Sequence, residues 1–122
     1  MMTPDDLAAW REHLTPALVE LDGMLFVARR GAGREAVQSE VSTYASAGEA
    51  QRWMNLVPVD GFISAMVGDD GADQDPAVAR ILSALERIWT AMIHAYFPGA
   101  VFVIDRLFDA ESGDVILRIR SP

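Results

Sequence analysis

The longest regular pattern of apolar side chains runs from Pro76 to Phe97. Apolar residues recur there at steps of three and four, as the buried face of an amphipathic helix requires. The residues of this face are Val78, Ile81, Leu82, Leu85, Ile88, Trp89, Met92, Ile93, Tyr96 and Phe97. Asp75 is a capping carboxylate before Pro76, and Pro98 ends the pattern. We therefore expect a long helix that contributes much of the core.

A second helical pattern begins at the amino terminus. Thr3 is a capping residue and Pro4 fits the first helical position, so a helix is expected over about 4–14. Pro16 interrupts the apolar spacing after a second threonine. A shorter helical segment is therefore expected over about 16–21.

Most of the remaining apolar runs are short and suit strands. We expect strands over 24–30, 52–59, 101–108 and 115–120, and one or two helical turns over 60–67. Residues 34–45 fit two patterns, because Val37 and Val41 share one face of either a helix or a strand. The Val, Thr and Tyr content and the preceding glycine-rich turn favour a strand that pairs with 24–30.

The last two strands form the clearest pair. A polar segment with Gly113 joins them, which is typical of a hairpin turn. Val115, Leu117 and Ile119 alternate with Ile116, Arg118 and Arg120, so one face is apolar and the other is largely basic. Together these patterns predict a single α+β domain over 1–122, with an antiparallel or mixed sheet of about 4–5 strands. The sheet is expected to pack against the long helix and the amino-terminal helix.

Composition narrows the class of protein. The 122 residues are 51% hydrophobic and 23% charged, which is a globular composition. Cysteine is absent, so disulfides, thiolate catalysis and cysteine-ligated metals are excluded. The first residues lack the positive charge and apolar run of a secretory signal, and no apolar stretch reaches the ~20 residues of a membrane span. We expect a soluble, cytoplasmic protein.

Charge narrows the class of partner. The formal net charge is −8, from 18 acidic and 10 basic residues. Such a charge repels phosphate backbones and anionic lipids, so neither nucleic acid nor membrane is an expected partner. An acidic loop over 68–75 contains Asp69, Asp70, Asp73 and Asp75. These carboxylates are candidate contacts for a basic protein partner.

No motif identifies a metal, cofactor or catalytic residue. The acidic loop fails as a calcium loop, because Gly71 stands third from Asp69 and Arg80 stands twelfth. The glycines of 31–33 lack the spacing of a nucleotide-binding loop. Three arginines flank this turn as a candidate anion site, namely Arg29, Arg30 and Arg34.

Two single residues remain as functional candidates outside the charged clusters. Trp53 has polar neighbours and is the tryptophan expected to reach a partner at the surface. Asp105 shares a strand face with Val101, Val103 and Leu107. If that face is buried, desolvation raises the pKa of the Asp105 carboxyl. If the opposite face is buried, Asp105 lies in water.

Two hypotheses for function follow. The first is a small acidic protein-binding module of the inhibitor, immunity or adaptor type. Homodimerisation through an edge strand is a separate form of association that the sequence also allows. The second is a small-ligand binder or modest enzyme with a pocket between the sheet and the long helix. In that pocket Arg29, Arg30 or Arg34 holds an anion, and His94 or Asp105 supplies acid–base chemistry. His13 and His94 are the two histidines, and neither has a nucleophile at a recognisable spacing.

Overall fold

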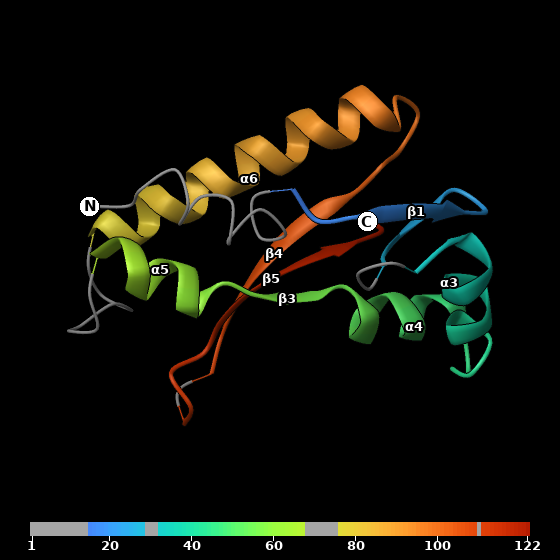
Figure 1. Cartoon of the computed structure of the whole chain (residues 1–122), viewed down its shortest axis with the longest axis horizontal. Helices are drawn as coiled ribbons and strands as arrows, with labels where there is room; N and C mark the ends of the chain where they lie inside the picture. The colour runs from blue at the N-terminus through green and yellow to red at the C-terminus, as the bar shows by residue number, and fades with distance from the viewer. Residues whose placement is uncertain (1–14, 29–31, 68–75, 110) are drawn as a thin grey trace.

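The computed structural model describes residues 15–28, 32–67, 76–109 and 111–122, and these form an α+β fold (Figure 1). The expected helix over 4–14 lies outside the described residues. In chain order the described elements are β1 (Leu18–Leu21), β2 (Met24–Val27), α3 (Arg34–Val41), α4 (Ala47–Met54), β3 (Leu56–Pro58), α5 (Asp60–Val67), α6 (Pro76–Tyr96), β4 (Val103–Phe108) and β5 (Val115–Arg120).

The described strands form two antiparallel sheets. In the three-stranded sheet β5 is central, with β3 on one side and β4 on the other. Asp105 lies opposite Arg118 in the β4–β5 pair, and Val57 lies opposite Leu117 in the β3–β5 pair. The β1–β2 hairpin forms the two-stranded sheet. The prediction of an antiparallel sheet is confirmed, although the strands divide into two sheets.

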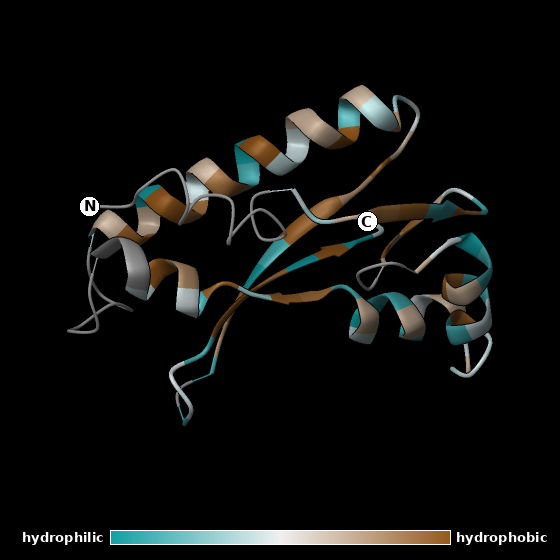
Figure 2. Ribbon diagram, viewed as in Figure 1, coloured by the Kyte–Doolittle hydropathy of each residue, from teal (hydrophilic) through white to brown (hydrophobic). Residues whose placement is uncertain are grey.

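The long helix α6 lies across the three-stranded sheet, as the sequence pattern predicts (Figure 1). Trp89 and Ile93 of α6 are fully buried, and they share a core with α5 and with the apolar face of β5. Val115, Leu117 and Ile119 form that face, which confirms the predicted alternation. Figure 2 shows hydrophobic and hydrophilic segments following one another along β4 and β5.

The β1–β2 hairpin separates this core from a second, smaller one. Leu25 packs in the main core, while its neighbour Phe26 packs in a cluster with α3 and α4. Because successive side chains of a strand point to opposite faces, one short hairpin serves both clusters. Each face of the hairpin is thus covered by protein.

Asn55 connects the hairpin to the three-stranded sheet. It is the only asparagine of the sequence and is 0% exposed. Its Oδ1 accepts a hydrogen bond from the backbone N–H of Val27 at 2.7 Å, and its Nδ2 donates to the carbonyl oxygens of Leu25 and Ile119, each at 2.8 Å. One buried amide therefore satisfies backbone groups of β2 and of β5, where no strand pairing joins the two.

Gln51 repeats this arrangement one helical turn earlier on α4. Its Nε2 donates to the carbonyl oxygen of Leu25 at 3.1 Å, and its Oε1 accepts from the N–H of Ser121 at 2.8 Å. Gln51 is 3% exposed. Asn55 caps the carboxyl end of α4 four residues after Gln51, so the helix and its cap present both amides to the same boundary between the sheets.

The expected helical segment over 16–21 is wrong, because Leu18–Leu21 forms β1. Asp22 and Gly23 both have positive φ, of 50° and 81°. Two such residues make the two-residue turn whose twist suits a β-hairpin, and Asp-Gly is a favoured sequence for it. The Asp-Gly pair therefore determines that the preceding apolar residues pair with 24–27. The strand expected over 24–30 is confirmed over 24–27, whereas residues 29 and 30 lie outside the described range.

The strand expected over 34–45 is also wrong. Arg34–Val41 is helical, and Val37, Val41 and Tyr44 pack in the smaller cluster at helical spacing. The strand expected over 52–59 is shorter than predicted, because α4 continues to Met54 before β3 begins at Leu56. Ser46 caps α4 by accepting a hydrogen bond from the N–H of Glu49 at 3.1 Å, so a helix begins there and takes up the first residues of the expected strand. The helical turns expected over 60–67 are confirmed as α5.

Candidate functional site

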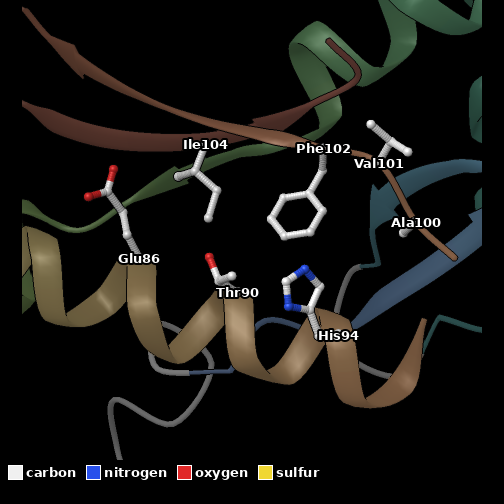
Figure 3. A pocket seen from close by; sticks show the side chains of 7 residues that line it. All are labelled: Glu86, Thr90, His94, Ala100, Val101, Phe102 and Ile104. Atoms are coloured by element: carbon white, nitrogen blue, oxygen red, sulfur yellow. The ribbon is translucent and has the colours of Figure 1, made fainter. Parts of the chain in front are cut away.

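A groove of about 480 Å³ separates α6 from the start of β4. We call it the α6–β4 groove; it is lined by Glu86, Thr90, His94, Ala100, Val101, Phe102 and Ile104 (Figure 3). It lies between the long helix and the sheet, which is where the ligand hypothesis places a pocket. One wall is polar and helical, and the other wall is apolar and comes from the strand.

The helical wall follows from residue spacing. Glu86, Thr90 and His94 stand four residues apart, so they project in a row from one flank of α6. Figure 3 shows this row facing Phe102 and Ile104, with Val101 turned away from the helix. The His94 and Phe102 rings meet edge to face, with their centroids 5.7 Å apart at an angle of 62°.

Arg106 forms an ion pair with Glu86 of the groove. Its Nη2 donates to Glu86 Oε2 at 2.6 Å and to Ser83 Oγ at 3.0 Å, and its Nε donates to both Glu86 oxygens. The hydrogen bond with Glu86 raises the pKa of Arg106 above its ordinary value. The negative charge of Glu86 is thus already matched, and the groove offers hydrogen-bonding groups more than free charge.

The edge of β4 beside the groove is open in the described part of the chain. The N–H of Asp109 donates to the carbonyl oxygen of Asp114, which marks that opposite pair as hydrogen-bonded. Bonded and non-bonded pairs alternate along an antiparallel ladder, and the register continues unbroken into β4. Ile104, Arg106 and Phe108 therefore direct their backbone N–H and C=O groups away from β5. No described strand pairs with them.

The opposite edge of the sheet is less suited to pairing. The strand β3 has three residues, and its last is Pro58. By the same alternation Pro58 occupies an outward-facing position, where it has no N–H to donate. Short edge strands and prolines are common protections against strand addition. The six-residue β4 lacks proline.

A second concave site lies on the other face of the sheet. We call it the basic recess; it has a volume of about 420 Å³ and is lined by Met24, Gly48, Gln51, Arg52, Arg118, Arg120, Ser121 and Pro122. Asp105 holds two of its arginines, since its Oδ2 accepts from Arg120 Nε at 2.6 Å and from Arg118 Nη2 at 3.1 Å.

Asp105 is ionised by these contacts and is not a candidate acid. The hydrogen bond from Arg120 is the largest cause that lowers the pKa of the Asp105 carboxyl below its ordinary value. The hydrogen bond from Arg118 and the attraction of both guanidinium groups act in the same direction, whereas burial opposes them. The expectation of a raised pKa is therefore wrong. Phe102 and Ile104 pack against the main core on the opposite side, while Asp105 is 22% exposed among arginines.

The sequence-based candidates are placed as follows. Arg29, Arg30, Asp69, Asp70, Asp73, Asp75 and His13 lie outside the described residues. Arg34 donates from Nη1 to the carbonyl oxygen of Glu20 at 2.9 Å, so its guanidinium braces β1. Trp53 is 54% exposed with the guanidinium of Arg52 5.7 Å from its ring centroid. Its role in partner binding stays a prediction.

Sequence reasoning missed the residues that the two sites bring together. Arg118 and Arg120 belong to the basic face that the alternation of β5 predicts, but their pairing with Asp105 depends on the β4–β5 register. Glu86 and Thr90 fall on the polar flank of the α6 pattern. Only the fold places that flank along β4.

The comparisons with known proteins give no relative: no family model, no curated protein and no solved structure matches the chain. Across the described ranges, no three His, Asp or Glu side chains group closely enough to hold a metal ion. Within the same ranges, no helix combines the length and apolar character that crossing a bilayer requires. The features of the fold that bear on function are therefore the groove, the open edge and the basic recess.

Proposed function

We propose that this domain is a protein-binding module that takes up an extended segment of a partner protein along β4. The segment adds a strand to the open edge of the sheet and lies in the α6–β4 groove. The single observation that carries the proposal is the position of the groove along an edge strand whose outward backbone groups have no described partner.

The backbone of β4 supplies sequence-independent affinity. Ile104, Arg106 and Phe108 each offer one N–H and one C=O to an incoming strand, as deduced from the register. Strand addition uses main-chain hydrogen bonds for affinity and adjoining pockets for alternate side chains of the peptide. The groove supplies such a pocket on the α6 side.

The groove supplies selectivity. Phe102 and Ile104 form an apolar wall, and both are only half-buried. Across from them, Thr90 and His94 offer hydrogen-bonding groups to the same side chain of a peptide. We expect a segment with apolar residues at alternate positions. The chain carries a net charge of −8, so a segment with basic flanks is favoured by long-range attraction.

The exposed apolar residues at both ends of the edge agree with this use. Val101 is 69% exposed before β4, and Phe108 is 55% exposed at its end. Large apolar side chains at the surface are common at protein-binding sites. They lie at opposite ends of the strand that a partner segment would follow.

The test begins with selection of binders from a random-peptide library displayed on phage, with the full chain as bait. Selected peptides are synthesised, and their affinities are measured by fluorescence anisotropy. Thr90→Trp fills the groove from the α6 wall, whereas Ala95→Trp adds the same bulk at an exposed position of α6 that lines neither site. We expect Thr90→Trp to weaken binding by about tenfold or more. The matched control should bind within about twofold of the unmodified chain.

Amide hydrogen exchange measured by NMR provides the second readout. Bound peptide should slow exchange at Ile104, Arg106 and Phe108, whose N–H groups face outward, and should leave Asp105 and Leu107 little changed, because β5 already protects them. Binding without added protection at the outward amides refutes strand addition. If the same amides are protected without peptide in a concentration-dependent dimer, the occupant is a second copy of the chain and not a partner.

A further inference from the structure

The basic recess has a charge opposite to that of the whole chain. Three of its lining residues are arginines, and no Asp or Glu side chain lines it. Asp105 contacts two of the guanidinium groups from β4, so among the side chains one carboxylate faces three guanidinium groups. The chain as a whole carries −8. This concentration of positive charge in a concave site requires an explanation other than general solubility.

The two strand-borne arginines are held in place but retain unused donors. A guanidinium group has N–H donors on Nε and on both terminal nitrogens. Arg118 donates from Nη2 to Asp105, and its Nε is buried with no acceptor in the described part of the chain. Arg120 donates from Nε to Asp105 and from Nη1 to the carbonyl oxygen of Ser121. Asp105 thus fixes the orientation of both groups with one oxygen and does not exhaust them.

The wall from α4 has a buried, hydrogen-bonded residue followed by an exposed one. Gln51 is buried and bonded to Leu25 and Ser121, so it fixes the carboxyl-terminal end of β5 against α4. Arg52 follows it, is exposed and lies over Trp53. A fixed pair of arginines and a third, exposed arginine that also lines the recess are a suitable set for an oxyanion, since guanidinium groups bind carboxylate and phosphate through paired N–H donors.

We propose that the basic recess binds the oxyanion group of a small molecule, a phosphate or a carboxylate, between Arg52, Arg118 and Arg120. The site lies on the face of the sheet away from α6, so it is independent of strand addition at β4. A volume of about 420 Å³ is in the range of small-ligand sites. Asp105 is a positioning residue for two of the three arginines.

The experiment is an NMR titration of the 15N-labelled chain with sodium phosphate and, separately, with sodium acetate. Sodium chloride keeps the ionic strength constant and serves as the reference anion. The signals followed are the Nε–Hε groups of Arg118 and Arg120 and the backbone amide of Ser121. Saturation by phosphate at lower concentration than acetate identifies a phosphate site, and the reverse order identifies a carboxylate site.

Matched variants separate the recess from general charge. Arg52→Gln removes one guanidinium that makes no described hydrogen bond, so the fold should persist, and we expect the affinity for the preferred anion to fall about tenfold. Arg87→Gln removes an equal charge from an exposed position on α6 outside the recess, and affinity should stay within about twofold. Arg120→Lys keeps the charge and loses the paired donors, so it should also weaken binding.

Three results overturn the proposal. The first is that the NMR signals shift without saturation in both phosphate and acetate, and by the same amount as in chloride. The second is an equal loss of affinity in Arg52→Gln and Arg87→Gln, which shows a response to net charge alone. The third is saturable binding that shifts none of the signals from Arg118, Arg120 and Ser121.

Discussion

Replacing Asn55 tests how much of the fold depends on one buried amide. In Asn55→Ala the N–H of Val27 and the carbonyl oxygen of Ile119 lose the partner described for them, whereas the carbonyl of Leu25 keeps its bond from Gln51. Each buried group left without a partner costs about 1–3 kcal/mol. With a small cavity added, the free energy of unfolding should fall by about 3–6 kcal/mol. That is a large part of the ~5–15 kcal/mol typical of a domain.

Urea unfolding followed by circular dichroism and by tryptophan fluorescence measures this loss. The control is Gln38→Ala, which removes an amide from an exposed position on α3 and should change the free energy of unfolding by less than about 0.5 kcal/mol. A loss of under about 1 kcal/mol in Asn55→Ala, or an equal loss in both variants, refutes the view that this amide joins the two sheets.

The shape-matched variant Asn55→Asp adds a dependence on pH. The new carboxyl is buried and faces the carbonyl oxygens of Leu25 and Ile119, which favour its protonated form, so its folded-state pKa is raised above the unfolded value of about 3.9. A raised folded pKa means that stability is retained below the unfolded pKa and lost as pH rises through the folded pKa. Relative to the unmodified chain, the variant should therefore be least impaired near pH 4 and most impaired near pH 7. A difference that is constant with pH contradicts this.

Three further outcomes are expected. Trp89→Ala should lower the free energy of unfolding by about 3–5 kcal/mol in urea titrations. Ile88→Ala, at a 40% exposed position of the same helix, should lower it by under about 1.5 kcal/mol. Similar losses in the two variants would show that the Trp89 face of α6 is not the buried one. Asp105→Asn should reduce the free energy of unfolding most above pH ~5 and progressively less below pH ~4. The reason is that the lowered pKa of Asp105 in the folded state contributes stability that is lost as the pH falls through that pKa. Urea denaturation at several pH values measures this, and a larger effect in acid contradicts it. Gly113→Ala should lower the melting temperature, because Gly113 has a φ of +76°, which strains any residue with a Cβ atom. Gly99→Ala should not lower it, because Gly99 has open space around it and no positive φ. Equal shifts in the two variants would refute this.

Sequence patterns predicted the elements whose side chains alternate between core and solvent. The long helix α6 and the β4–β5 hairpin follow directly from their apolar periods, because burial against a single core is what selects those residues. The same reasoning failed for Arg34–Val41, where helical and strand periods coincide at Val37 and Val41. Packing against α4 and the β1–β2 hairpin decides between them, and that contact is not local in sequence.

The sites were less predictable than the fold. The basic face of β5 could be predicted from alternation, but its ion pairing with Asp105 needs the pairing of residues 105 and 118. Asn55 gave no signal in the sequence, since its bonds join residues 28, 30 and 64 positions away. Asp22-Gly23 did carry a local signal for a hairpin, and the apolar spacing of the preceding residues hid it.

Two neighbouring residues of β4 carry opposite charges to opposite faces of the sheet. Asp105 meets Arg118 and Arg120 on one face, and Arg106 meets Glu86 on the other. If β4 slipped by one residue against β5, its side chains would exchange faces. An acid would then confront Glu86, and a base would confront the two arginines. Repulsion between like charges would therefore disfavour the slipped register at two positions, which helps to specify the correct pairing of β4 with β5.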